Sequence, residues 1–151
     1  MKNDIFSRDN IFIIDENLDS KNELFKLVSI KAFELNYVKS VDECYEGLLY
    51  RENQQTTGFQ DGFAIPHCKD NTVFSPKVLV FKTNPIDWDS LDGKPVTVSL
   101  VVLVPQNASN EHLKLLAKLA KALIDDSFQE QIKNGDFDTI YNNISLIMED
   151  K

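Results

Sequence analysis

The spacing of apolar and polar residues in the first third of the chain predicts one strand and two helices. The short apolar run from Ile11 to Ile14 is typical of a strand. After it, Asp19 or Ser20 can cap a helix, because apolar residues then recur with a helical period of about 3.6 residues. Ser40 and Glu43 form a capping-box pattern at the start of a second helix, which we expect to end before the polar loop that follows. The apolar positions are Leu24, Leu27, Val28, Ala32 and Leu35 in the first helix, and Val41, Cys44, Tyr45, Leu48 and Leu49 in the second.

The rest of the chain predicts strands first and helices afterwards. Residues 77–83 and 96–104 are strand candidates, and Asp92-Gly93 between them is a turn signal. Toward its C-terminal end the second of these runs is apolar on both faces, which is typical of a strand in a sheet covered on both sides. Helical patterns follow at about residues 110–124, 127–133 and 137–148.

With a short strand through Phe63, Ala64 and Ile65, the predicted order of elements is β-α-α-β-β-β-α-α-α. This order favours an α/β sandwich, in which helices flank a mixed sheet of about five strands. A chain of 151 residues can bury a core without disulfides or metals. We therefore expect a single α/β domain over residues 1–151.

The composition argues against several classes of partner. Sixteen Lys and Arg residues against 24 Asp and Glu residues give a net charge of −8. Nucleic acids and anionic membrane surfaces bind basic protein surfaces, so we expect neither as a partner. No apolar run reaches the roughly 18 residues of a membrane span, and the N-terminus lacks the apolar segment of a signal peptide. With only two cysteines, these features predict a cytoplasmic protein without direct membrane insertion.

His67 is the strongest candidate for chemistry, because it follows a rigid segment at the end of a polar loop. Pro66 fixes its own φ and favours an extended conformation at Ile65, so the predicted strand should end in a stiff elbow with His67 just beyond it. An imidazole there can act as a nucleophile, as an acid or base, or as a metal ligand. A structural histidine bonded to nearby backbone is the alternative.

His112, the second of the two histidines, falls in the first turn of the predicted helix over residues 110–124. The apolar positions that surround it on a helical wheel include Leu115, Leu119, Leu123, Ala117 and Ile124. We therefore expect its imidazole to face inward, whereas the lysines of this helix form a solvated row on the far face. A histidine bonded locally at a helix start is the alternative, and the sequence alone favours it.

Arg51 and Cys68 complete the set of candidates. Arg51 borders the buried face of the second helix near its end, where it is either a favourable cation at a helix C-terminus or a fixed cation for an anionic group on His67. Cys68 follows His67 on an extended segment, so the two side chains should point to opposite sides. A Cys/His hydrolase and a metal site of His67, His112 and Cys68 are therefore weak alternatives, since neither has supporting spacing.

Three segments of the chain resemble one family of proteins. The stretch RENQQTTG from Arg51 to Gly58, followed by GFAIPH from Gly62 to His67, is similar to the active-site region of the fructose/mannitol-type IIA components of the bacterial phosphoenolpyruvate–sugar phosphotransferase system. The segments WDSLDGKPV (88–96) and NEHLKLLAKLA (110–120) resemble the family's strand-turn-strand signature and its second histidine helix. The first of these two favours the fructose branch. Cys68 stands where glycine or alanine is commoner in the family, and we expect it to be a packing thiol.

The resemblance implies a phosphocarrier with an α/β sandwich fold. His67 would accept a phosphoryl group from phosphorylated HPr and pass it to the cysteine of a IIB domain, which serves sugar uptake through the membrane component IIC. His112 and Arg51 would assist, Thr57 and Gly58 would bind the phosphoryl group, and neither a cofactor nor a metal would be needed. The alternative within the family is a regulatory module of the nitrogen type, in which phosphorylation of His67 controls protein partners.

Overall fold

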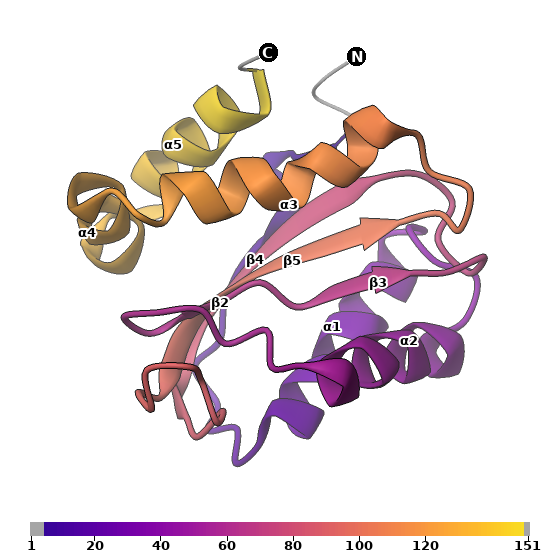
Figure 1. Cartoon of the computed structure of the whole chain (residues 1–151), viewed down its shortest axis with the longest axis horizontal. Helices are drawn as coiled ribbons and strands as arrows, with labels where there is room; N and C mark the ends of the chain where they lie inside the picture. Colours follow the sequence, from indigo (N-terminus) through magenta and orange to yellow (C-terminus); the bar gives the residue numbers. More distant parts are fainter. Residues whose placement is uncertain (1–4, 150–151) are drawn as a thin grey trace.

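The computed structural model of the chain describes residues 5–149, without the side chains of residues 113 and 149. A mixed sheet lies between two layers of helices, with α1 and α2 on one face and α3, α4 and α5 on the other (Figure 1). The predicted α/β sandwich is therefore confirmed. The strands are β1 (Ile11–Ile13), β2 (Phe63–Ala64), β3 (His67–Lys69), β4 (Lys77–Ile86) and β5 (Val96–Val104), and a short 3-10 helix (Arg8–Asn10) precedes β1. The helices are α1 (Lys21–Glu34), α2 (Val41–Gln54), α3 (Asn110–Ala122), α4 (Asp126–Asn134) and α5 (Phe137–Glu149).

The five strands are arranged in the order β1-β4-β5-β2, and β3 also pairs with β5. The long strands β4 and β5 are antiparallel, whereas β1 pairs with β4, and β2 and β3 pair with β5, in parallel. Phe63 lies opposite Val98 and His67 opposite Val102, so β2 and β3 share one register on β5. They form a single edge strand that is interrupted at Ile65 and Pro66.

Pro66 explains why this strand is at the edge. Proline has no backbone N–H to donate, so it is tolerated in a sheet only where no partner needs that donor. Its carbonyl still accepts a hydrogen bond from the backbone N–H of Val102, at 3.0 Å. The sequence predicted that His67 would lie beyond the strand. His67 does lie beyond β2, which ends one residue earlier than expected, but the chain re-joins β5 directly after Pro66, so His67 is also the first residue of a second short strand that the sequence did not predict.

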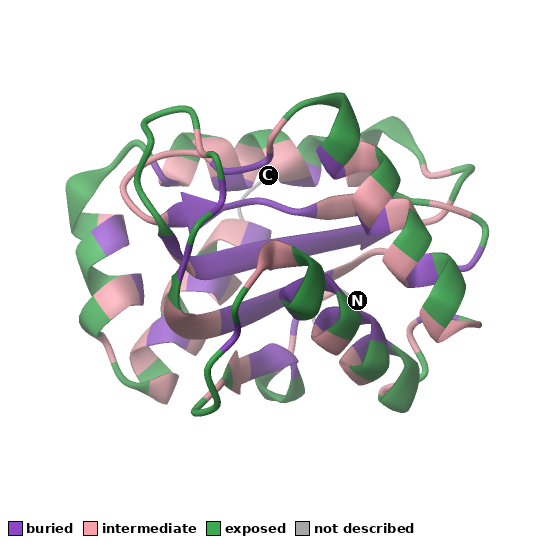
Figure 2. Ribbon diagram, turned by 90° about the horizontal axis from the view of Figure 1, so that it is seen from below, coloured by how far each residue is buried: buried purple, intermediate pink, exposed green. Residues whose placement is uncertain are grey.

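The sheet separates two apolar cores. The strands at its centre are buried along most of their length, whereas the helices are buried only on the sides that face the sheet (Figure 2). Leu24, Phe25 and Trp88 belong to the core under α1 and α2, and Leu119 and Ile132 to the core under α3, α4 and α5. Serine side chains cap three of the helices, as Ser20, Ser40 and Ser109 each accept a backbone N–H from the third residue of the helix.

The buried face of α3 is narrower than the sequence predicted. Leu115, Leu119 and Leu123 are buried, but Ala117 and Ile124 are exposed. The helix ends at Ala122, so Ile124 lies beyond the regular turns from which the helical wheel was drawn. His112 lies on the same side as the buried leucines and is half-buried, which agrees with the expected inward orientation.

Gly47 allows α2 to lie close against β3. A Cβ atom at this position would be 2.5 Å from the Sγ atom of Cys68, closer than real side chains approach each other. The Cys68 side chain is fully buried beneath α2, where close packing makes any displacement of its Sγ atom costly. Gly47 and Cys68 therefore set the separation of the helix that carries Arg51 from the strand that carries His67.

We expect Gly47→Ala to lower the free energy of unfolding by about 1–3 kcal/mol, because the added methyl group overpacks the contact with Cys68. The better helix propensity of alanine offsets only up to about 1 kcal/mol of this loss. Urea unfolding followed by circular dichroism measures the change. Cys68→Ala is the second arm of a double-mutant cycle, in which the pair Gly47→Ala/Cys68→Ala should lose less stability than the sum of the single variants. Additive losses would contradict the proposed contact.

Candidate active site

The three side chains that the sequence singled out meet at the edge of the sheet. His67 is the first residue of β3, Arg51 lies in the last turn of α2, and His112 lies in the first turn of α3. All three line one pocket of about 260 Å³, whose other lining residues are Lys69, Val102, Val104 and Leu116. The pocket thus lies where helices from both layers reach the interrupted edge strand.

The imidazole of His67 is held at both of its nitrogen atoms. Nδ1 lies 2.9 Å from the backbone oxygen of Ile65, and Nε2 lies 2.8 Å from Nε of Arg51. A carbonyl oxygen only accepts and a guanidinium only donates, so Nδ1 carries the hydrogen and Nε2 presents its lone pair. The geometry therefore selects one tautomer, in which Nε2 is the nitrogen whose lone pair can form a new bond.

The surroundings of His67 also favour its neutral form. Burial is the largest effect and lowers the pKa of the imidazole below its usual value, while the hydrogen bond to the Ile65 carbonyl raises it. The positive charge of Arg51 lowers the pKa further, and the negative charge of Glu52 raises it by less. The net shift is downward. The ring therefore keeps its lone pair on Nε2 at neutral pH.

Arg51 and His112 are positioned by the ends of their helices. The Nη1 atom of Arg51 donates to the backbone oxygen of Gln55 at 2.7 Å, just past the end of α2, where a cation is favourable. The backbone N–H of His112 donates to the side chain of Ser109, the cap residue of α3. His112 is half-buried and lines the same pocket as His67.

The structure gives Thr57 and Gly58 partners other than the pocket. The N–H and hydroxyl groups of Thr57 both donate to the carboxylate of Glu52, and the N–H of Gly58 donates to Oγ1 of Thr56 at 3.1 Å. A Cβ atom on Gly58 would lie 2.3 Å from Oγ of Ser90, so this glycine permits a close packing contact. In the described part of the chain, neither residue lines the pockets that adjoin His67. Phosphoryl binding by these two residues would require their present hydrogen bonds to be exchanged.

Two residues of the site were not identified from the sequence. Lys69 follows His67 by two positions on β3, so both side chains lie on one side of the strand, and Lys69 lines the same pocket. The two-residue period of a strand would have indicated it. Glu52 is buried and bonded to α1, to the loop after α2 and to Trp88, and its pattern of partners has no signal in the local sequence.

Cys68 does not have the environment of a nucleophile. Its side chain is fully buried on the side opposite to His67, and burial, with smaller contributions from Cys44 and Asp70, raises the pKa of its thiol well above the usual range. A Cys/His hydrolase therefore has no support here, and the expected packing thiol fits this environment. Among residues 5–149, no three His, Cys, Asp or Glu side chains are grouped so that they could hold a metal ion.

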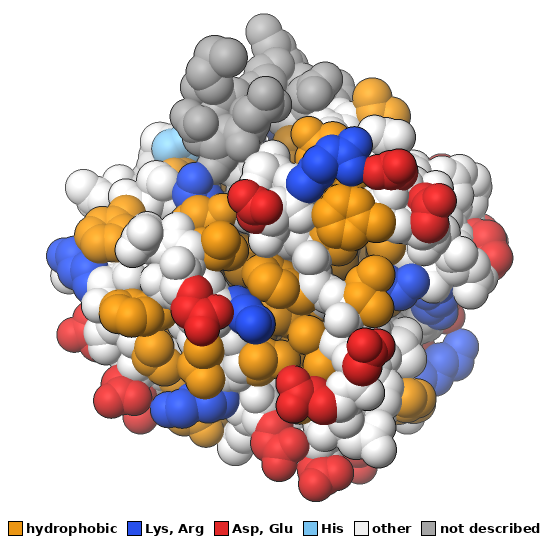
Figure 3. Space-filling view, turned by 180° about the vertical axis from the view of Figure 1, so that it is seen from behind, with side chains coloured by type: hydrophobic (Ala, Val, Ile, Leu, Met, Phe, Trp, Pro, Cys, Tyr) orange, Lys and Arg blue, Asp and Glu red, His pale blue; other side chains and the backbone are white. Residues whose placement is uncertain are grey.

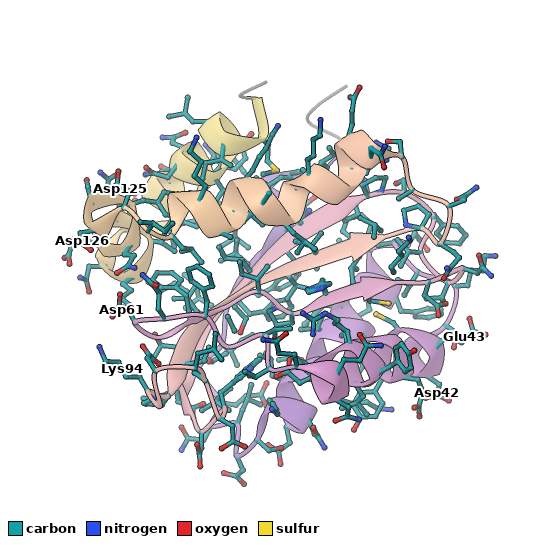
Figure 4. All side chains as sticks on the ribbon, viewed as in Figure 1. Asp42, Glu43, Asp61, Lys94, Asp125 and Asp126 are labelled. Atoms are coloured by element: carbon teal, nitrogen blue, oxygen red, sulfur yellow. The ribbon has the colours of Figure 1, made fainter. Side chains whose placement is uncertain are left out.

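An open cleft of about 930 Å³ lies beside the pocket and connects His67 with the surface. It runs between α2 and the segment after β3, and Asp42 and Glu43 lie at the start of α2 (Figure 4). Glu46 and Asp70 add two more carboxylates, and Tyr50 is 70% exposed beside them. Because the cleft is wide and solvent-accessible, a protein partner can reach His67 through it.

Two further features concern the surface and the helices. On the face seen from behind, acidic and basic side chains are interspersed with hydrophobic ones, and the residues described there form no continuous basic patch (Figure 3).

Within the described part of the chain, every helix is too short or too polar to cross a membrane.

Residues 4–146 of the chain match the family model described as "Phosphoenolpyruvate-dependent sugar phosphotransferase system, EIIA 2". The chain is 30% identical over 130 residues to the PTS system fructose-like EIIA component of Escherichia coli strain K12, a match that covers 84% of this chain and 88% of that protein. It is 36% identical over 99 residues to the PTS system fructose-specific EIIABC component of Mycoplasma pneumoniae. That match covers 66% of this chain but only 14% of the longer relative.

Solved structures have the same fold. The nitrogen regulatory protein IIA-Ntr from Neisseria meningitidis superimposes with a TM-score of 0.83 at 30% identity, over 96% of this chain and 97% of that one. The IIA mannitol enzyme of Escherichia coli, solved in complex with phosphorylated IIB mannitol enzyme, superimposes with a TM-score of 0.76 at 17% identity, over 93% of this chain and 96% of that one. With the family match over residues 4–146, these likenesses show that the chain belongs to the EIIA type 2 family of the phosphoenolpyruvate-dependent sugar phosphotransferase system.

Proposed function

We propose that this protein is a phosphocarrier in which Nε2 of His67 accepts a phosphoryl group from phosphorylated HPr and passes it to the cysteine of a IIB domain. The observation that carries the proposal is the double hydrogen bonding of the imidazole, because it places the hydrogen on Nδ1 and leaves Nε2 with a lone pair that can form a new bond once Arg51 changes its partner. The solved IIA mannitol–IIB mannitol complex supports a IIB domain as the acceptor. The partners and the two free cysteines fit a cytoplasmic location, with any contribution to a membrane component being indirect.

The first transfer exchanges one phosphorus–nitrogen bond for another. The lone pair of Nε2 forms a bond to phosphorus, and the bond to the donor's imidazole breaks and leaves its electron pair on the donor nitrogen. The ring of His67 becomes positively charged in this step. Its Nδ1–H group remains bonded to the carbonyl of Ile65, which stabilises that charge, and no proton has to leave the site.

Arg51 changes its partner during the same step. Its Nε–H group donates to the lone pair of Nε2 before transfer, and that lone pair disappears into the new bond. The Nε–H group can then donate to an oxygen of the phosphoryl group, while Nη1 keeps its bond to Gln55. His112 and Lys69 line the same pocket and can contact the group there, while Val102, Val104 and Leu116 form the apolar part of its lining.

The second transfer reverses these changes. The thiolate of the IIB cysteine attacks phosphorus, the bond to Nε2 breaks, and its electron pair returns to His67 as the lone pair. Arg51 can then resume its bond to Nε2. The site therefore returns to its starting protonation state after each cycle, and neither transfer step requires a metal or a cofactor.

The fructose type of sugar uptake is the first candidate for the pathway, and nitrogen-type regulation is the second. The segment 88–96 and the fructose-like relative favour the first. The likeness to the nitrogen regulatory protein, at 30% identity over 96% of the chain, favours the second. Both use phosphorylation of His67, and they differ in whether a IIB domain receives the group.

Incubation with phosphoenolpyruvate, enzyme I and HPr should add one acid-labile phosphoryl group, measured as a gain in intact mass. His67→Ala should abolish the gain, because it removes the only attacking nitrogen in the proposal. His112→Ala is the matched control: it should still be phosphorylated, with a rate lower by up to about 10²-fold through loss of one group at the transferring oxygens. Phosphorylation of the folded His67→Ala variant at the parent rate would contradict the proposal.

Addition of a fructose-type IIB domain to the phosphorylated protein distinguishes the two pathways. For the sugar-uptake pathway we expect rapid loss of the phosphoryl group from His67 and its appearance on the IIB cysteine, which intact mass measures on both proteins. For nitrogen-type regulation we expect the group to remain on His67. A IIB domain whose cysteine is replaced by serine is the control for spontaneous hydrolysis.

The pKa of His67 should lie below its usual value of 6.5, and nitrogen-detected NMR should show hydrogen on Nδ1 alone in the neutral ring. Arg51→Ala should raise this pKa by removing a nearby positive charge. The imidazole of His67 binds a proton more tightly in the unfolded chain than in the folded protein, so the unfolded state is protonated first as the pH falls through 6.5. The contribution of His67 to the free energy of unfolding therefore decreases as the pH falls below that value. A titration midpoint above 6.5 in the parent would contradict the derived environment.

A further inference from the structure

Glu52 is a buried carboxylate next to Arg51 in the last turn of α2. Its side chain is only 2% exposed. Its two oxygens accept hydrogen bonds from Nζ of Lys21 at 3.2 Å, Oγ1 of Thr56 at 3.1 Å and Nε1 of Trp88 at 3.1 Å, and from both the N–H and the hydroxyl of Thr57. These donors come from α1, from the loop after α2 and from the segment after β4. Glu52 therefore joins three separate parts of the chain to the end of α2.

A continuous path of hydrogen bonds leads from Glu52 to one nitrogen of His67. Glu52 accepts from the N–H of Thr57, and the carbonyl of Thr57 accepts from the N–H of Ile65 at 3.0 Å. The carbonyl of Ile65 in turn accepts from Nδ1 of His67 at 2.9 Å. Each step joins neighbouring groups, so the position of the Ile65 carbonyl depends on how the loop at Thr57 is held.

A second path leads from Glu52 to the other nitrogen. Arg51 precedes Glu52 directly, and its side chain points about 100° away around the helix. The Nη1 atom of Arg51 bonds the carbonyl of Gln55, in the loop that Glu52 fixes through Thr56 and Thr57, and its Nε atom bonds Nε2 of His67. Both hydrogen bonds on the imidazole thus come from segments that Glu52 ties together.

We propose, on the basis of the phosphocarrier function above, that Glu52 is a positioning residue that holds the Ile65 carbonyl and Arg51 at the two ring nitrogens of His67. Glu52 touches neither the ring nor the pocket that His67 lines with His112. Stability alone gives a weak reason for a buried charge, since well-packed apolar groups of the same size often stabilise a fold equally well. The carboxylate of Glu52, in contrast, can only accept hydrogen bonds, and several donors point at it. This arrangement fixes the loop at Thr56 and Thr57 in one position.

The size-matched variant Glu52→Gln tests the role of the carboxylate. Its amide oxygen can replace Oε2, which accepts from both Lys21 and Trp88, but its NH2 group then faces the backbone N–H of Thr57, which donates to Oε1 in the parent. We expect the neutral ring of His67 to become a mixture of the two tautomers, measured by nitrogen-detected NMR. We also expect the single-turnover rate of phosphorylation by phosphorylated HPr to fall by about tenfold or more, because misplacement within a site is costly. Glu52→Asp keeps the charge and should partly restore both properties.

Ile140→Ala is the control for a general loss of stability. Ile140 is fully buried in the core on the other side of the sheet, and its truncation lowers the free energy of unfolding without touching the loop at Thr57. We expect this variant to keep the parent's tautomer and the parent's rate. If Ile140→Ala shows the same changes as Glu52→Gln, or if folded Glu52→Gln keeps the parent's tautomer and rate, the proposal is wrong.

Thr57→Val covers the case in which Glu52→Gln does not fold. It removes one donor to Glu52 while the backbone N–H of residue 57 remains, so we expect smaller changes in the same direction. A Thr57→Val variant identical to the parent in both measurements would then overturn the proposal. The NMR measurement needs no phosphoryl donor. A parent protein that is not phosphorylated at all would therefore reject the proposed function and still leave the positioning role tested.

Discussion

The edge strand formed by β2 and β3 keeps a single register on β5 although Pro66 interrupts it, and the direction of each side chain at the site follows from that register. Because side chains alternate along a strand, fixing Cys68 under α2 turns His67 and Lys69 to the other side. The missing N–H of proline costs nothing at an edge, and its fixed φ stiffens the approach to His67. His67, the nucleophile of the proposed function, is thus held in one orientation at an edge of the sheet that an open cleft connects with the surface.

The two helical layers contribute complementary groups to this edge. The end of α2 provides Arg51 at a helix C-terminus, where a cation is favourable, and the start of α3 provides His112 where free backbone N–H groups favour an anion. The sheet supplies the apolar side of the pocket through Val102 and Val104. The arrangement combines donors with a water-poor surface, which strengthens the interaction of each donor with a charged group.

Much of the fold and the central residues of the site were predictable from local patterns. Serine caps and the 3.6-residue period mark the helices, and the proline before His67 marks the elbow. The two-residue strand β2 and the three-residue strand β3 are too short to show a period, so the position of His67 within a strand was not predictable. The donors of Thr57 were assigned to a phosphoryl group from the resemblance, whereas in the fold Glu52 takes them. The partners Lys21 and Trp88 lie 31 and 36 residues from Glu52, and no local pattern reports contacts at that distance.

Arg51 and Glu52 divide two requirements of the site between adjacent residues. In the proposed transfer the cation moves from Nε2 of His67 to a phosphoryl oxygen, and Arg51 is half-buried beside an open cleft that gives its guanidinium room to move. The carboxylate must hold its surroundings still, and it is buried among donors that fix it from several sides. Because the two side chains leave the helix about 100° apart, one turn of α2 faces both the pocket and the core. Arg51 can therefore exchange hydrogen-bond partners while Glu52 keeps the surrounding loop fixed. A substitution of Arg51 should change the geometry of His67 directly, and a substitution of Glu52 should change it through the loop.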